Sequence, residues 1–346
     1  MTWRANWRPR MHNAQTLSHP PARTLAMGES EAVVGRPTVR APFSLGLMKA
    51  AANHPELVLL TADLGKYTDV ADFRARYGER FFNVGMAEQA LVGAAAGLSK
   101  VGKVAYCTTY GTFATRRAYD FLAIACAHSH ENVKMFAGNP GLTTGYGGTH
   151  QATEDLALMR SIPNMSVIDP CDATEMAQIA EMAADLPGTL YCRLLRADVA
   201  QVFDPATHRW RPGTGHVIGS SAADTDVGLV STGLMTGRAI DAAGHLRQRG
   251  ASASVFHSAS LKPFDSQGLL AFAQSARRLV VLENHVASGG LATLVIEALQ
   301  EAGLARRLLK IALPDQFIEC GSLAYLQERY GLTTERICAR VGAWLQ

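Results

Sequence analysis

The stretch from Arg80 to Leu98 reads RFFNVGMAEQALVGAAAGL and contains one complete strand–turn–helix step. The apolar run from Phe81 to Val84 predicts a short strand, and Gly85 predicts the turn after it. The alanine- and glycine-rich run that follows predicts a helix whose first turn carries Glu88. A chain that passes from strand to helix through so tight a turn is typical of an α/β fold.

The same alternation extends outward from this stretch in both directions. Before it, residues 42–55 have apolar side chains at helical spacing, and ELVLLTAD at residues 56–63 reads as a buried strand. After it come more strands alternating with helices, and these strands are KVAYCTTY, VKMFAG, MSVIDP and TLYCRLL. Strands separated by helices predict a parallel sheet covered by helices on both faces.

A second unit of the same kind follows a polar bridge, DPATHRWRPGTGHV. Its predicted strands are DVGLVSTG, ASVFHSAS and RRLVVLEN. We therefore predict an α/β protein with two parallel-sheet-based domains, residues 37–205 and 225–346, joined by a linker at 206–224. Residues 1–36 are rich in arginine and proline, and no acid precedes Glu29, so we expect a disordered extension rather than a transit peptide.

The composition argues against several classes of protein. Of 346 residues, 33 are Lys or Arg and 30 are Asp or Glu, and the net charge of +3 gives no reason to expect a nucleic-acid partner. Since no run of about 18 apolar residues is present, no membrane span is expected. The 6 cysteines form no Cys-x-x-Cys pair and several sit in apolar strands, which favours a reducing, cytoplasmic location over a disulfide framework.

Several motifs, taken in order, resemble one enzyme family. FNVGMAEQALVGAAAGL is similar to the pyrimidine-domain sequence of transketolases and of 1-deoxyxylulose-5-phosphate synthases. TADLG, TFATRRAYD, GTHQATEDLALMRSIPNMSVIDPCDATE and YCRLLR occur in the family's order and at roughly its spacing. The resemblance extends over about residues 36–346. The chain looks like the C-terminal-half, beta-type subunit of a split transketolase, with a pyrimidine-binding domain followed by a transketolase C-terminal domain.

The resemblance implies a role for Glu88 that local composition does not. By itself, an acid in the first turn of a helix is more often a solvated group that complements the helix dipole. In the family, the matching glutamate binds N1′ of the aminopyrimidine of thiamine diphosphate and promotes the tautomer that deprotonates the thiazolium. The resemblance also implies that Phe113, and secondarily Tyr110, face the aminopyrimidine and that Asp63 lies near the cofactor. Without it, the two aromatics read as core residues and Asp63 as a loop cap.

Four further residues match substrate-binding positions of the family. His150, in GTHQATED, resembles a catalytic histidine that exchanges a proton with a substrate oxygen, and its alternative is a helix-capping or exposed side chain. Arg40 and Arg193 match arginines that hold the anionic tail of sugar phosphates, although surface arginines usually only serve solubility. Asn139 stands where many transketolases have another histidine, and the loop GLTTGYGG departs from their acidic GEDG pattern. Both departures leave the exact substrate open.

A motif that the sequence lacks predicts the assembly. Thiamine diphosphate needs Mg²⁺ and a diphosphate cradle, which the family supplies from a GDG-plus-Asn motif, and no GDG occurs here. The resemblance therefore implies a separate diphosphate-binding subunit that carries the Mg²⁺ ligands, and an α2β2 heterotetramer containing a homodimer of this chain. The expected reaction is transfer of a two-carbon ketol unit between sugar phosphates or related polyols. The alternatives are a decarboxylating 1-deoxyxylulose-5-phosphate-synthase-like or 2-oxoacid dehydrogenase beta subunit, and a non-catalytic regulatory relative.

Overall fold

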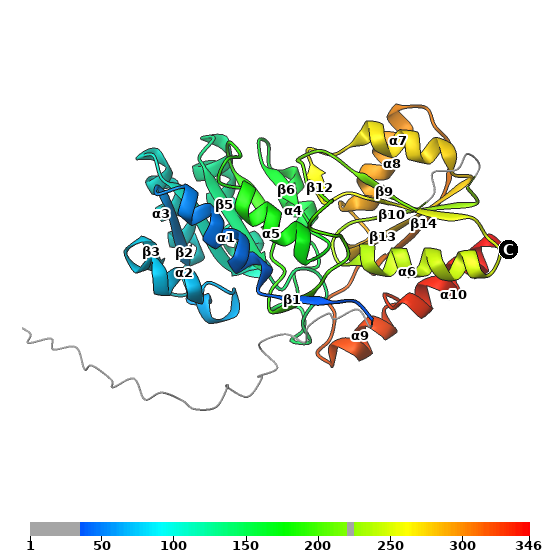
Figure 1. The fold of residues 1–346 in the computed structure, drawn as a ribbon, viewed down its shortest axis with the longest axis horizontal. Coiled ribbons are helices and arrows are strands. Elements are labelled where there is room, and N and C mark those ends of the chain that lie inside the picture. Colours follow the sequence, from blue (N-terminus) through cyan, green and yellow to red (C-terminus); the bar gives the residue numbers. More distant parts are fainter. Residues whose placement is uncertain (1–34, 220–224) are drawn as a thin grey trace, which may run out of the picture.

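Two α/β units lie side by side in the structure, a computed structural model that describes residues 35–219 and 225–346 (Figure 1). The first unit runs from the blue to the green part of the ribbon, and the second from yellow to red. This arrangement confirms the predicted α/β class. The predicted N-terminal extension falls, except for its last two residues, outside the described residues.

The first unit is built on a seven-stranded sheet with the order β12-β6-β7-β5-β4-β2-β3. All its pairs are parallel except the edge pair of β6 and β12. In β2, Leu57 and Leu59 enter one core cluster while Val58 and Leu60 enter another, so both faces of the sheet are covered. The strands are β2 (Leu57–Thr61), β3 (Phe81–Asn83), β4 (Val104–Tyr110), β5 (Val133–Gly138), β6 (Ser166–Ile168), β7 (Leu190–Arg193) and β12 (Ser260–Lys262).

Helices cover the two faces of this sheet. The helices on the Leu57 face are α1 (Pro42–Asn53), α2 (Ala71–Arg76) and α5 (Ala173–Met182). Those on the opposite face are α3 (Glu88–Lys100), η4 (Phe113–Arg117), η5 (Phe121–His128) and α4 (Asp155–Ser161). Two 3₁₀ turns, η2 (Gly65–Tyr67) and η3 (Gly78–Arg80), flank α2. α1 and α5 approach so closely that a Cβ on Gly46 would lie 2.1 Å from the carbonyl oxygen of Ala177.

The segment FATRRAYDFLAIACAH, between β4 and β5, is π-helical and interrupted in the structure. η4 and η5 are separated by Ala118–Asp120, and the Ala118 N–H donates to the Phe113 carbonyl oxygen at 3.3 Å. Such wide turns occur frequently at functional sites. Here η4 brings the Arg117 guanidinium carbon to 4.8 Å from the centroid of the Phe113 ring.

The second unit has a five-stranded sheet with the order β14-β13-β10-β11-β9, in which only β9 is antiparallel. Its strands are β9 (His216–Ile218), β10 (Val227–Ser231), β11 (Ala253–His257), β13 (Arg278–Val286) and β14 (Arg307–Leu313). α7 and α8 lie on one face, and α6 and α10 on the other (Figure 1). The helices are α6 (Met235–Gln248), α7 (Ser266–Ser275), α8 (Leu291–Glu301), α9 (Leu323–Arg329) and α10 (Thr334–Leu345).

The two units are connected by more than a linker, because they share a strand pairing and a hydrophobic core cluster. β12 comes from the second half of the chain but extends the first sheet by pairing with β6. One core cluster includes Leu91 of α3 as well as Leu269 and Phe272 of α7. The predicted linker contains β9, and a separate ribbon pairs β1 (Thr38–Arg40) with β8 (Asp198–Ala200). The domain boundaries given above stay predictions.

No helix in the described parts of the chain is both long enough and apolar enough to cross a membrane. All 6 cysteines lie in those parts and have free thiols, and only Cys320 is exposed.

Candidate active site

The candidate residues gather along the carboxyl edge of the first sheet. Asp63 follows β2, Glu88 follows β3, Tyr110 ends β4, Asn139 follows β5 and Arg193 ends β7. These five strands are neighbours in the sheet, in the order β7-β5-β4-β2-β3. Five motifs that are separate in the sequence therefore lie next to one another along one edge of the sheet. This edge of a parallel sheet is where α/β proteins bind ligands.

Glu88 is the first residue of α3 and is only 1% exposed. Its carboxylate has two partners: Arg117 Nη1 donates to Oε2 at 2.7 Å, and Thr109 Oγ1 donates to Oε1 at 3.4 Å. Arg117 itself is 44% exposed, so only the acid end of this ion pair is buried. Such burial does not fit a solvated acid that merely complements the helix dipole, because burying a carboxylate requires specific partners.

Three aromatic rings surround His150, and one of them belongs to Phe113 in η4. Tyr110 and Phe113 are stacked, with centroids 6.0 Å apart and 29° between their planes. The His150 ring meets Phe113 edge-on at 5.6 Å, Tyr110 at 6.3 Å and Tyr146 at 5.7 Å. His150 is half-buried in a loop well before α4 begins, which does not fit a helix-capping role. The fold therefore brings two distant aromatic segments together around one imidazole.

Asp63 is exposed and adopts a left-handed conformation, with φ 60°. Its N–H donates to Asn83 Oδ1 at 3.0 Å, and Asn83 Nδ2 donates back to Asp63 Oδ1 at 2.9 Å. The same Asn83 oxygen accepts the Gly85 N–H at 3.0 Å. Asn83, which the sequence did not single out, thus ties the loop after β2 to the turn that leads to Glu88. Asp63 and Asn83 also line an open cavity of about 940 Å³.

Arg196, missed by the sequence analysis, is half-buried among the candidate residues. Its Nη2 donates to Asn139 Oδ1 at 2.8 Å, and its guanidinium carbon lies 5.9 Å from the Tyr110 ring centroid. Burial raises the pKa of Asp69, and the charges of Arg196 and Arg40 oppose that rise, so both arginines lie near this acid. The position of Arg196 just beyond the end of β7 was the feature that could have identified it, because loops after parallel strands face the ligand edge.

Arg193 does not fit its predicted role as a substrate ligand. The side chain is 2% exposed; Nε and Nη2 donate to Asp155 at 2.9 and 2.5 Å, and Nη1 donates to Asp169 at 3.2 Å. Nη2 also donates to the carbonyl oxygen of Asn284, from the second unit, at 3.2 Å. Burial alone would raise the pKa of Asp155, but the Arg193 charge lowers it, whereas burial raises the pKa of Asp169 to about 6. With all three nitrogens engaged, Arg193 joins the two units instead.

The glycine-rich loop from Asn139 to Gly148 packs directly on the second unit. The Leu142 N–H donates to Asn284 Oδ1 at 2.8 Å, and the Gly321 N–H donates to the Gly145 carbonyl oxygen at 3.0 Å. A Cβ on Gly145 would lie 2.0 Å from the Gly321 carbonyl oxygen. This close backbone approach leaves no room for a side chain at position 145, so the loop is held against the second unit by backbone contacts.

Comparison with known proteins covers both units. The profile of the family "Transketolase, pyrimidine binding domain" matches residues 36–201, and that of "Transketolase, C-terminal domain" matches residues 218–337.

Two relatives and one solved structure are similar over most of the chain. The chain is 41% identical to "Putative uncharacterized transketolase family protein y4mN" of Sinorhizobium fredii, over 96% of each protein. It is 32% identical to "6-deoxy-6-sulfo-D-fructose transketolase subunit SqwH" of Clostridium sp., over 84% of this chain and 89% of that protein. A solved structure described as "Split gene transketolase, inactive beta4 tetramer" superimposes with a TM-score of 0.81 and 39% identity, over 89% of this chain and 98% of that one.

Proposed function

The chain belongs to the transketolase family, and on that premise we propose that it is the beta-type subunit of a split, thiamine-diphosphate-dependent transketolase. The complete enzyme would transfer a two-carbon ketol unit between sugar phosphates or related polyols. The observation that carries this proposal is the buried carboxylate of Glu88, on the same sheet edge as the stacked rings of Tyr110 and Phe113.

The residues at this edge fit the pyrimidine end of the cofactor. Phe113 is half-buried and offers a ring face, and stacking on a flat heteroaromatic ring contributes about 0.5–1.5 kcal/mol beyond burial. Asp63 and Asn83, hydrogen-bonded to each other, lie on the neighbouring strand ends of the same edge. When bound, thiamine diphosphate supplies a nucleophilic carbon and an electron sink.

Glu88 would hold the hydrogen bond to a pyrimidine nitrogen through one of its two oxygens. Oε2 is occupied by Arg117 at 2.7 Å, whereas the contact of Oε1 with Thr109 is long, at 3.4 Å. A good hydrogen bond is shorter than this, so Oε1 has capacity for a new partner. We therefore assign Oε1 to the cofactor and Arg117 to charge balance of the buried carboxylate.

His150 and the arginines would act on the substrate. Thr149 Oγ1 is 2.9 Å from His150 Nδ1, so we assign Nε2 to exchange a proton with a substrate hydroxyl. Arg196 and Arg40 would bind the anionic tail, since a guanidinium fork suits phosphate or sulfonate. Asn139 would orient Arg196 through their 2.8 Å hydrogen bond.

The proposal includes a partner subunit with the diphosphate cradle and the Mg²⁺ ligands, in an α2β2 assembly. Three observations support it. The sequence contains no GDG, the matching profiles name only pyrimidine-binding and C-terminal domains, and the relative SqwH is described as a subunit. A beta4 tetramer described as inactive is also what beta chains without a partner would form. Free, mostly buried thiols support a cytoplasmic location.

Reconstitution tests the proposal. The chain is co-purified with a GDG-bearing partner and supplied with Mg²⁺, thiamine diphosphate and an aldose acceptor. Ketose phosphates, hydroxypyruvate and pyruvate are compared as donors. We expect ketol transfer from a ketose phosphate or hydroxypyruvate by the complex and neither turnover nor tight cofactor binding by the chain alone. Activity with pyruvate only would favour the decarboxylating alternative, and tight binding by the isolated chain would contradict the split-subunit proposal.

A further inference from the structure

A cluster of histidines surrounds the buried carboxylate of Glu175 at the junction of the two units. Glu175 lies in the first turn of α5, where Asp172 Oδ1 accepts its N–H at 2.8 Å. His257 ends β11 of the second unit, while His208 and His216 come from the connecting stretch. The cluster uses none of the residues assigned to cofactor or substrate. Three parts of the chain that are distant in sequence thus converge on one acid.

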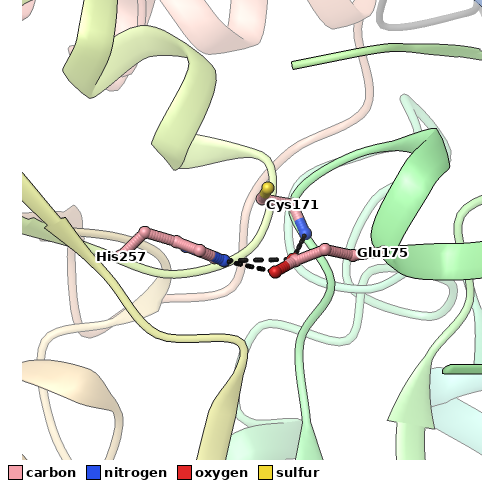
Figure 2. Close-up of side chains that lie close together, drawn as sticks. All are labelled: Cys171, Glu175 and His257. Atoms are coloured by element: carbon pink, nitrogen blue, oxygen red, sulfur yellow. Dashed lines mark hydrogen bonds and ion pairs between the residues drawn. The ribbon is translucent and has the colours of Figure 1, made fainter. Parts of the chain in front are cut away.

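The Glu175 carboxylate is fully buried and receives several donors. Figure 2 shows His257 Nε2 directed at the carboxylate, with distances of 3.0 and 3.1 Å to its two oxygens, and the Cys171 N–H donating to Oε2 at 3.0 Å. His208 Nε2 lies 3.3 Å from Oε1. Buried carboxylates are paired with cations, hydrogen-bond donors or metals, and this one has imidazoles on two sides.

His216 is the member of the cluster that has a ring nitrogen without a hydrogen-bond partner. Its Nε2 is buried and has no hydrogen-bond partner among the described residues. The His216 ring centroid lies 4.6 Å from that of His208. One nitrogen each of His208 and His216 and one oxygen of Glu175 all lie within 4.8 Å of one another. A buried imidazole nitrogen without a partner is costly, and neutral imidazole nitrogen is a preferred metal ligand.

We propose that Glu175, His208 and His216 bind a divalent cation, Zn²⁺ in the first place. Zn²⁺ takes nitrogen and carboxylate ligands at about 2.0–2.2 Å in a tetrahedron, which separates neighbouring ligand atoms by about 3.3 Å. His208 Nε2 and Glu175 Oε1 already have this separation, at 3.3 Å. The His216 nitrogen lies within 4.8 Å of both atoms, so a shift of at most about 1.5 Å would bring it to this spacing, with a water molecule as the fourth ligand.

The neighbouring side chains support this set of ligands over an alternative one. Cys171, Glu175 and His257 also have potential ligand atoms close together. Both ring nitrogens of His257 are engaged, however, because Nδ1 lies 2.7 Å from Thr236 Oγ1 and Nε2 contacts the carboxylate. His257 therefore positions Glu175 from the outer shell, as partners of metal-binding carboxylates do.

Phe203 fixes the orientation of the second ligand. Its ring stacks flat on His208, with centroids 3.9 Å apart and 3° between the planes. The ion would tie the connecting stretch to α5 and, through His257, to the second sheet. We assign the site a structural role that is independent of the thiamine-diphosphate proposal.

Metal analysis of the full chain, purified without a polyhistidine tag, tests the site. The chain is stripped with a chelator, dialysed with Zn²⁺, desalted and measured by inductively coupled plasma mass spectrometry. We expect about one zinc ion per chain. His216→Gln, which keeps the side-chain volume, should weaken binding by at least about 100-fold, since loss of even an outer-shell partner costs 10–100-fold. His128→Gln, exposed at the end of η5, is the matched control and should bind as the wild type does.

Two further measurements keep the test decisive if a variant is poorly folded. Co²⁺ loaded in place of zinc should give the visible absorption of a four-coordinate site in the wild type and in Cys171→Ala, but not in His216→Gln. A chelator should lower the melting temperature of the wild type and leave that of His216→Gln unchanged. A wild type that retains no metal, or a His216→Gln chain that retains as much as the wild type, would overturn the proposal. Loss of binding in Cys171→Ala alone would move the site to the other ligand set and overturn it as well.

Discussion

Replacing Arg193 with methionine should destabilise the fold by about 3–5 kcal/mol, because it leaves buried carboxylates without their cation. The Asp155 side chain is 0% exposed and loses two donors, at 2.9 and 2.5 Å, while Asp169 loses one at 3.2 Å. Burial already raises the pKa of Asp169 to about 6. Removing the guanidinium should raise that pKa further, so the loss of stability should be smaller at about pH 5 than at about pH 8.

The assay is equilibrium unfolding in urea, followed by circular dichroism, for the wild type and two variants. Arg196→Met is the matched control, because it removes an arginine three positions along that is only half-buried. It should change the free energy of unfolding by at most about 1 kcal/mol. In the reconstituted enzyme it should raise the KM of a phosphorylated donor by about 10–100-fold, the equivalent of a lost charge-assisted hydrogen bond of about 1.5–3 kcal/mol.

The opposite pattern would refute this reasoning. If Arg193→Met unfolds at the wild-type urea concentration and raises the KM of the phosphorylated donor, then Arg193 binds substrate and its buried ion pairs contribute nothing. If Arg196→Met leaves KM unchanged, the assignment of the anionic tail to Arg196 fails while the structural role of Arg193 stands.

Three further predictions concern Glu88 in the candidate site, the docked loop at Gly145 and the buried His285. Glu88→Gln should lower kcat of the reconstituted enzyme by about 10²–10⁴-fold with little change in melting temperature, and near-normal turnover would contradict the assignment. Gly145→Ala should lower the melting temperature, because its Cβ would lie 2.0 Å from the Gly321 carbonyl oxygen; an unchanged melt would mean that the loop is not docked there. His285 accepts the Ala157 N–H through Nε2, and burial lowers its pKa from 6.5 to about 4. Between these values the unfolded chain binds more protons than the folded one, so stability falls as pH drops, by up to about 1.4 kcal/mol per pH unit. His285→Gln should flatten that slope in urea unfolding, and an unchanged slope would assign it to other groups.

Much of the fold could be predicted because its determinants are local. The apolar run of β2 and the turn at Gly85 mark their elements by composition and period alone. The same holds for the position of Glu88 at the start of α3, since the strand, the turn and the helix are consecutive in the sequence. The edge strands β9, β12 and β14 escaped prediction, because each depends on a neighbour from elsewhere in the chain more than on its own pattern.

The two arginines of YCRLLR show that local sequence does not predict which charged side chain is buried. Nothing in that motif reveals that the first arginine meets Asp155, Asp169 and the Asn284 carbonyl, at sequence separations of 38, 24 and 91 residues. Those partners come from α4, the loop directly after β6, and β13, and only their convergence buries the guanidinium of Arg193. Arg196, beyond the strand end, stays at the ligand edge for the same reason.

The sequence by itself thus determined the order of elements, the α/β class and the motifs that lie at the carboxyl edge of the first sheet. The tertiary structure alone decided which polar groups are buried together: Arg193 between the two units, Glu88 with Arg117, and Glu175 among three histidines. The physical reason is that helix and strand patterns depend on nearest neighbours along the chain. The burial and pairing of charges depend instead on neighbours in space, which only the packing of the helices, strands and loops of both units provides.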